Sequence, residues 1–175
     1  MKNNLIKKYF FLIVYRSFAQ YLPTLGRSTL SKNIRFLCCK HIFANIRKNV
    51  NIERRAFFNK GFELEIGDNS GIGIGCYVPW SIKIGCNIMM GPQVYIFGGT
   101  THVFDDLQKP IRLQGRTKYK RVIIEDDVWI GRQVIINQGR RISTGTIIAA
   151  GNVVTKDFPP HSIIGGNPAQ LIRSR

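Results

Sequence analysis

The chain has 175 residues, with 26 Lys and Arg against 10 Asp and Glu, and a formal net charge of +16. This length leaves room for one domain and a modest extension. The four cysteines form no C-x-x-C pair, which argues against a zinc knuckle or a redox pair and favours reduced thiols in a cytosolic protein. A charge this high suits a partner such as nucleic acid, anionic lipid or a phosphorylated substrate.

The amino-terminal part, residues 1–45, is expected to form a helical extension. Within it, an apolar run at residues 9–15 follows two lysines and ends before Arg16. A bilayer span needs about 20 apolar residues, so this run cannot cross a membrane alone. It is also short for a signal peptide. We expect a helix of roughly residues 3–20 whose apolar face either caps the next domain or lies on a membrane surface.

From residue 46 onward the most regular feature is an aliphatic residue at every sixth position. These residues are Ile66, Ile72, Val78, Ile84, Met90 and Ile96, then, after a break, Ile124, Ile130, Ile136, Ile142, Ile148 and Val154. The helical period of 3.6 and the strand period of 2 do not produce this spacing. A hexapeptide repeat predicts a parallel β-helix, in which three units close one coil and the aliphatic side chains stack along the axis.

An earlier six-residue phase precedes the main one and is offset from it by two. It comprises Ile46, Ile52, Phe58 and Leu64. We expect it to form a slightly irregular first coil of the domain at residues 46–175. Glycine follows the repeat residue at Gly67, Gly73, Gly85, Gly91 and Gly131. We expect these glycines at coil corners, with φ values that other residues avoid.

The repeat is broken between Ile96 and Ile124, which lie 28 positions apart, or four units plus four residues. The register is therefore lost and then reset. This predicts a loop at residues 97–120 that protrudes from the coil. Loops on a rigid scaffold are frequent locations of catalytic residues.

His102 lies in this loop and is followed closely by Asp105 and Asp106. Histidine takes up protons near neutral pH, and a nearby carboxylate can fix its tautomer, as general-base catalysis requires. We therefore predict His102 as a catalytic base, with Asp105 or Asp106 as the group that orients it. The same spacing also fits an ordinary loop histidine beside solvated carboxylates.

Three segments near the carboxyl end carry a resemblance to a known family. They read Asp126-Asp-Val-Trp-Ile-Gly131, Ala149-Ala-Gly-Asn-Val-Val-Thr-Lys-Asp157 and Gly165-Gly-Asn-Pro-Ala169. With them, roughly residues 62–175 resemble the hexapeptide-repeat acyltransferases, which include maltose, galactoside and serine acetyltransferases. The H-x-F-D-D loop and the amino-terminal features resemble the branch that acts in colanic acid, capsule and lipopolysaccharide assembly.

The resemblance implies an all-β fold, a left-handed parallel β-helix with a protruding loop and a carboxy-terminal tail at residues 158–175. It implies that His102 deprotonates the acceptor and that acetyl-CoA is the acyl donor, with no metal ion. Matching positions assign Trp129, Gly131 and Arg132 to the pantetheine arm. The remaining donor contacts fall on Ala150, Thr155, Lys156 and Arg173. The family also implies a homotrimer whose active site lies between neighbouring subunits.

The chain departs from the family pattern in the segment Gln138-Gly-Arg-Arg-Ile-Ser143, where relatives often read P-G-V-x-I-G. Its two arginines either face solvent or meet anionic substrate or cofactor. Ala149 stands where glycine is frequent, and Thr101 stands where asparagine often precedes the histidine. These differences leave the surroundings of the histidine open.

The function expected from the sequence is acetyl-CoA-dependent O-acetylation of a sugar hydroxyl, in a free or lipid-linked precursor of a surface polysaccharide. The alternatives are an N-acetyltransferase acting on an amino sugar and a maltose-type or serine-type acetyltransferase. We expect a cytoplasmic protein, free or peripheral on the inner face of the cytoplasmic membrane.

Two other classes of protein fit the sequence less well. A zinc carbonic anhydrase of the same fold needs three histidine ligands, but only one histidine lies near the break. A basic scaffold or nucleic-acid binder would use interleaved aromatic residues, and these are sparse beside the basic loop. No nucleic-acid partner is expected.

Overall fold

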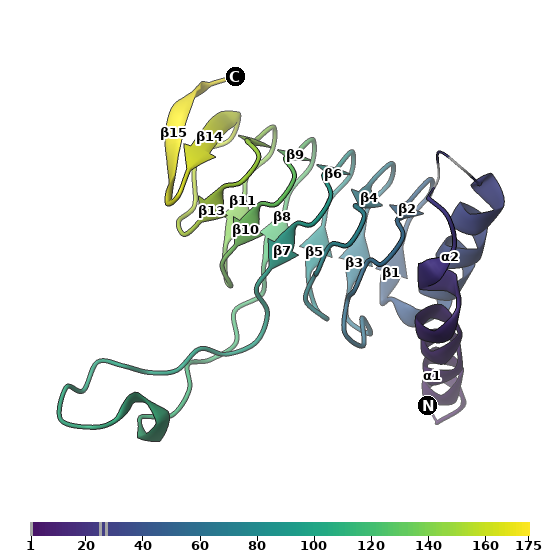
Figure 1. Cartoon of the computed structure of the whole chain (residues 1–175), viewed down its shortest axis with the longest axis horizontal. Coiled ribbons are helices and arrows are strands. Elements are labelled where there is room, and N and C mark those ends of the chain that lie inside the picture. The colour runs from purple at the N-terminus through teal and green to yellow at the C-terminus, as the bar shows by residue number, and fades with distance from the viewer. Residues whose placement is uncertain (1, 25, 27) are drawn as a thin grey trace.

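The computed structural model describes residues 2–24, 26 and 28–175, and it forms a solenoid of short strands with helices at one end (Figure 1). The helices are α1 (Lys2–Ser17), the 3₁₀ turn η1 (Ala19–Tyr21) and α2 (Thr29–Ile42). Ser28 is the N-cap residue of α2, and its hydroxyl accepts a hydrogen bond from the backbone N–H of Ser31 at 3.2 Å. This bond pairs one of the amide groups left open at a helix start.

The strands β1 to β13 are each two residues long. They are β1 Asn45–Ile46, β2 Asn51–Ile52, β3 Glu65–Ile66, β4 Gly71–Ile72, β5 Lys83–Ile84, β6 Met89–Met90, β7 Tyr95–Ile96, β8 Ile123–Ile124, β9 Trp129–Ile130, β10 Ile135–Ile136, β11 Arg141–Ile142, β12 Ile147–Ile148 and β13 Val153–Val154. Two longer strands, β14 (Ser162–Gly166) and β15 (Ala169–Ser174), end the chain, and η2 (Ile111–Leu113) lies in the loop.

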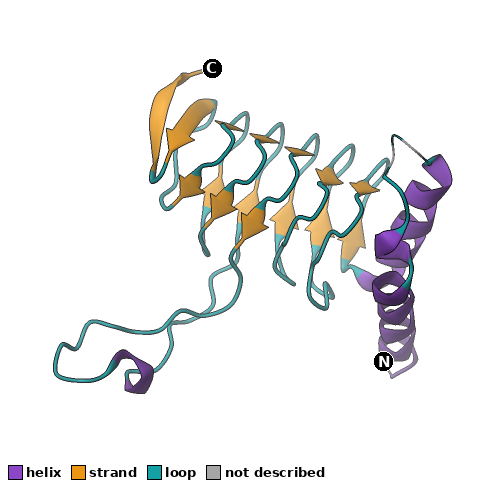
Figure 2. Cartoon of the chain, in the orientation of Figure 1, coloured by secondary structure: helices purple, strands orange, loops and turns teal. Residues whose placement is uncertain are grey.

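These strands stack in three faces around one axis. The first face is β1-β3-β5-β8-β11, the second contains β2-β4 and β6-β9-β12-β14-β15, and the third contains β7-β10-β13. All the pairs are parallel except β14 with β15, so each coil lies in register on the previous one. The predicted left-handed parallel β-helix is thereby confirmed (Figure 2).

The repeat residues form the core. Of the twelve aliphatic residues at six-residue spacing, all are buried except Met90, which is partly buried. Removing each such side chain from water contributes about 1.5–3 kcal/mol. Ile46 and Ile52 pair with Ile66 and Ile72, as a first coil should. Leu64 is also buried, but it belongs to a second inner row that precedes each repeat residue by two positions.

The corner glycines have a different cause from the one expected. A Cβ on Gly67 would lie 2.7 Å from backbone atoms of the next coil, and one on Gly131 would lie 2.6 Å from the nitrogen of Ala150. The positive φ angles occur two residues later, at Asn69 and Gln133, both 55°. These glycines are therefore required by close coil stacking, and the expectation of unusual φ values was wrong for them.

The break in the repeat is an insertion at one corner. Ile84 pairs with Ile124 across 40 positions, whereas Ile66 pairs with Ile84 across 18. The loop therefore adds 22 residues, leaves the coil after β7 and returns to begin β8. Figure 1 shows it projecting far from the coils.

The final segment is more ordered than the tail that the sequence suggested. β14 adds to β12 in parallel, and β15 folds back on β14 in antiparallel fashion. This hairpin covers the carboxy-terminal end of the coil stack, which would otherwise present open strand edges.

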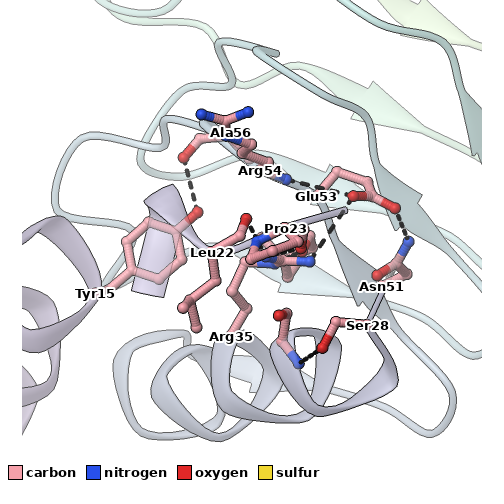
Figure 3. Close-up of polar contacts among 11 residues, drawn as sticks. Tyr15, Leu22, Pro23, Ser28, Arg35, Asn51, Glu53, Arg54 and Ala56 are labelled. Carbon is pink, nitrogen blue, oxygen red and sulfur yellow. Dashed lines mark hydrogen bonds and ion pairs between the residues drawn. The ribbon is translucent and has the colours of Figure 1, made fainter. Parts of the chain in front are cut away.

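A buried arginine ties the helices to the first coil (Figure 3). The side chain of Arg35 is fully buried, and its Nε donates to the carbonyl of Ile52 at 2.5 Å. Its Nη1 donates to the carbonyls of Leu22 and Pro23 at 3.1 and 2.9 Å. Its Nη2 lies 3.8 Å from a carboxylate oxygen of Glu53. Burial lowers the pKa of Arg35, and Glu53 opposes that shift.

The inner face of α1 also caps the first coil. Tyr15 is buried, its hydroxyl donates to the carbonyl of Ala56 at 2.8 Å, and its ring packs against Phe58. α1 therefore caps the first coil, which is one of the two roles that the sequence suggested for its apolar face. Among the described residues, no helix is long and apolar enough to cross a bilayer.

Candidate active site

His102 lies on the outgoing limb of the protruding loop. Its backbone forms an antiparallel bridge with Arg116, and the N–H of Val103 donates to the carbonyl of Gly115 at 3.1 Å. The two limbs therefore run side by side near the coil. The imidazole is exposed and has no hydrogen-bond or ion-pair partner among the described residues. It is accessible to an incoming hydroxyl group.

The two nearby carboxylates do not orient this imidazole within one chain. Asp106 Oδ1 accepts from the N–H of Gln108 at 2.9 Å, which closes a loop turn. Asp105 is exposed. No ion pair joins either aspartate to His102 in the part of the chain that the structure describes. Proximity in sequence therefore did not produce the expected carboxylate–histidine contact.

An open cavity lies where the loop leaves the coil, and its volume of about 420 Å³ is within the range of small-molecule sites. It is lined by Phe97, Gly98, Thr100, Thr101, Asn137, Gln138, Arg140 and Thr155. The residues that follow β7, β10 and β13 meet here because these three strands pair in register. Thr101 immediately precedes His102, so the backbone of the predicted base adjoins a lining residue, although His102 itself is not part of the lining.

Sequence reasoning missed the role of Phe97 and Asn137 in this cavity. A usable signal was available, because the register reset places the residues after Ile96 next to those after Ile136, one coil later. A loop inserted at that corner must adjoin the same corner of the following coil.

Hydrogen bonds fix the root of the loop to the coil. The hydroxyl of Thr101 lies 3.1 Å from that of Thr117 on the returning limb. The side-chain amide of Gln138 donates to the same Thr101 oxygen at 3.2 Å. The position of the segment next to His102 is therefore set by the coil corner after β10.

The two arginines that depart from the family pattern, Arg140 and Arg141, make contacts on different faces of the coil. Arg140 lines the cavity, donates to the carbonyl of Thr155 at 3.3 Å and lies 3.4 Å from the carboxylate of Asp157. Arg141 forms an ion pair with Glu125 on another face. A hydrogen bond from the backbone of Thr144, together with Arg141, lowers the pKa of Glu125. Arg140 is therefore the arginine that an anionic ligand in the cavity would meet.

Four of the predicted donor-binding residues form one group. Trp129 is half exposed on β9, and Gly131 and Arg132 follow at the corner. Ala150 occupies the same corner one coil later, against Gly131. The N–H of Gly151 donates to the carbonyl of Arg132 at 2.9 Å. The group presents the ring of Trp129 beside the close corner of Gly131 and Ala150, a surface that fits an extended thioester arm.

The other three residues predicted to bind the donor are Thr155, Lys156 and Arg173, which all follow β13 in the chain. Thr155 lines the cavity, whereas the ammonium of Lys156 donates to the side chain of Gln170 on β15 at 2.9 Å. Arg173, also on β15, is exposed. Lys156 and β15 thus lie together. Two exposed cations on adjoining elements suit phosphate groups, which bind guanidinium and ammonium donors.

The three histidines do not converge. His41 packs on the ring of Phe11 with centroids 4.2 Å apart, and His161 is exposed before β14. Within residues 2–24, 26 and 28–175, no group of three His, Cys, Asp or Glu side chains is placed to hold a metal ion. The three-histidine zinc site of the alternative enzyme class is not present there.

Comparisons with known proteins agree on one family, although no protein-family model matches the sequence. The chain is 31% identical over 136 residues to galactoside O-acetyltransferase of Escherichia coli K12. The alignment covers 77% of this chain but 65% of that relative, which is less than two thirds of it. A putative acetyltransferase of Saccharomyces cerevisiae is 31% identical over 148 residues, covering 83% of this chain and 74% of the relative.

A solved structure supports the same assignment. The hexapeptide-repeat acetyltransferase of Vibrio cholerae O1 biovar eltor, complexed with acetyl coenzyme A, superposes with a TM-score of 0.72 at 30% identity. The match covers 84% of this chain and 79% of that one. Sequence and fold together place the protein in one group: the chain belongs to the hexapeptide-repeat acetyltransferase family.

Proposed function

We propose that the protein transfers an acetyl group from acetyl-CoA to a hydroxyl group of a sugar. The observation that carries the proposal is the cavity at the loop root, which places the residue next to His102 beside coil corners of an acetyltransferase fold. The E. coli relative is a galactoside O-acetyltransferase, which supports a sugar as acceptor.

His102 acts as the general base in this proposal. Its imidazole accepts the proton of the acceptor hydroxyl as the oxygen forms its bond to the acetyl carbon, and it returns that proton to the departing thiol. Acetyl-CoA supplies the acetyl group as an activated thioester. Backbone N–H groups at the coil edge stabilise the negative charge that develops on the carbonyl oxygen. Asp105 and Asp106 stay the predicted candidates for the group that orients the imidazole.

Trp129, Gly131, Arg132 and Ala150 hold the pantetheine arm in this proposal, and Thr155, Lys156 and Arg173 hold the phosphates. The exposed ring of Trp129 and the close corner at Gly131 suit a thin, flexible chain. The cations suit phosphate. The acetyl-CoA complex of the V. cholerae relative supports the same donor.

We further propose that the active unit is a homotrimer. Phe104 and Leu107, close to His102 in the loop, are 65% and 93% exposed, which is costly for apolar side chains that no other group covers. A neighbouring subunit would cover them and complete the site around the base. Light scattering tests this: a mass of three chains supports it, and an active monomer would contradict it.

For the acceptor we favour a free or lipid-linked precursor of a surface polysaccharide, acetylated in the cytoplasm or at the inner face of the cytoplasmic membrane. The four cysteines are free, which suits a reducing compartment. Acetylation of an amino sugar, or of a small acceptor such as maltose or serine, is the second candidate, and the galactoside O-acetyltransferase of E. coli favours a sugar among these.

Release of free thiol from acetyl-CoA tests the proposal when it is measured with galactosides, maltose, amino sugars, serine and lipid-linked saccharides. Release that requires a sugar hydroxyl supports O-acetylation, and release that requires an amine identifies the alternative. Absence of acetyl-CoA binding in calorimetry, together with no release for any acceptor, would contradict acetyl transfer.

A further inference from the structure

Helix α1 has two apolar faces: one is buried within the chain, and the other is largely exposed, although its Tyr9 contacts the ring of Phe62 with centroids 5.1 Å apart. The inner face, with Leu12 and Tyr15, is buried against α2 and the first coil. The outer face of α1 comprises Leu5, Ile6, Tyr9, Phe10 and Ile13, between 39% and 67% exposed. At about 100° per residue these five side chains cover a continuous arc of about 140°. Such an arc marks a binding surface.

The helical region that carries this face is rich in basic residues. Residues 1–52 contain ten Lys and Arg and no Asp or Glu, and the first acidic residue is Glu53. Lys7 is an exposed cation beside one border of the outer face. Arg16, at the carboxyl end of α1, is exposed too, but its Nη2 donates to the carbonyl of Asn59 at 2.8 Å. A surface that joins exposed apolar side chains to net positive charge is complementary to a partner that is apolar inside and anionic outside.

We propose that the outer face of α1 docks on an anionic lipid surface, with the helix lying in the headgroup region. The apolar arc enters the boundary of the acyl chains, and Lys7 at its border meets the phosphate groups. The helix lies on the bilayer and does not span it, because its 16 residues measure about 24 Å against about 30 Å of hydrocarbon.

A second copy of the chain fits this face less well. Two copies meeting through α1 would bring like charges together, because residues 1–52 include no acidic residue to pair with their lysines and arginines. Figure 1 shows the helices at the opposite end of the solenoid from the carboxy-terminal hairpin. Docking there leaves the coil corners and the loop accessible, so the contact does not depend on the proposed chemistry.

Co-sedimentation of the full chain with vesicles tests the contact. Vesicles of phosphatidylcholine with phosphatidylglycerol are expected to bind the protein at least about ten-fold more tightly than phosphatidylcholine alone, with the difference shrinking in high salt. The variant Ile6→Ser/Phe10→Ser/Ile13→Ser should lower the partition coefficient by about 10²-fold. All three side chains are exposed, so the thermal transition should stay near that of the wild type.

A matched control removes exposed apolar side chains from the neighbouring helix. Leu30→Ser/Leu37→Ser on α2 should bind anionic vesicles much like the wild type, since both leucines lie outside the outer face of α1. Equal binding by the α1 variant and the wild type would overturn the proposal, as would equal binding to both vesicle types. A loss of subunits from the α1 variant in light scattering would also overturn it and identify the face as an interface between copies.

Acetyl transfer to a soluble acceptor should be the same in the wild type and the α1 variant. Failure of the chemistry is thus read from thiol release, whereas failure of docking is read from sedimentation.

Discussion

The side-chain amide of Gln138 donates a hydrogen bond to the hydroxyl of Thr101, with 3.2 Å between nitrogen and oxygen. The two residues are far apart in sequence, yet this bond fixes the loop segment that carries His102 to the wall of the cavity. The register of the coils brings them together, because β10 stacks on β7.

Replacing Gln138 by leucine should loosen the loop root and lower kcat/KM by about ten-fold, because misplacement of a base is costly even when the base is intact. Gln138→Glu should retain most of the activity, since the Thr101 hydroxyl can donate to a carboxylate. Steady-state kinetics of both variants give the test. Equal activity of the leucine variant and the wild type would show that the bond between Gln138 and Thr101 does not position His102.

Arg35 should be the most sensitive side chain of the amino-terminal region. Arg35→Met leaves three carbonyls without their buried donor and removes the cation 3.8 Å from Glu53, and we expect a loss of about 3–5 kcal/mol in the free energy of unfolding. Urea denaturation measures this loss. Lys32→Met on the same helix is the control. Because Lys32 makes an exposed contact with Asn49, the change should be within about 0.5 kcal/mol. Similar values for both variants would contradict the burial argument.

Gly131→Ala should destabilise the coil by about 1–3 kcal/mol, because the added methyl group meets the backbone of Ala150, which cannot move aside. Gly26→Ala is the comparison, since a Cβ there meets nothing within 4 Å. The midpoint of thermal unfolding should fall in the first variant alone. If both midpoints stay unchanged, close coil stacking does not require the glycine.

Cysteine reactivity reports the packing of the solenoid. Burial raises the pKa of Cys76 to about 11 and also raises that of Cys38 and Cys39, so their thiolate fractions at pH 8 are very small. Cys86 is only partly buried. Alkylation at pH 8 should modify Cys86 in the folded protein and the other three after unfolding, as mass spectrometry would show. Early modification of Cys76 would mean that the coil opens at that position.

The coil was predictable because its cause is periodic. One aliphatic residue per face stacks on the next, so Ile124 could be matched to the axis from sequence alone. The corner glycines were placed correctly but explained wrongly, since sequence spacing does not report how closely Gly131 approaches the next coil. The hairpin of β14 and β15 lay beyond the repeat, where no periodic signal marked it.

The site was predictable only in part, because only its periodic surroundings leave a signal in the sequence. His102 was found from the break in the repeat, and the cavity beside it follows from stacking. The directions of Asp105 and Asp106 were not predictable, because a long loop has no repeat to orient its side chains. The buried position of Arg35 depends on packing between the helices and the first coil, which a single sequence does not reveal.

The most direct test of the central claim is acceptor-dependent thiol release from acetyl-CoA by His102→Ala, measured beside His161→Asn. Asparagine suits the control because His161 has a φ of 59°, a conformation that asparagine tolerates. We expect kcat to fall by about 10²–10⁴ in His102→Ala, the usual contribution of a positioned acid–base group, and to stay near the wild-type value in the control. A His102→Ala enzyme that retains most of its activity would contradict the assignment of His102 as the base.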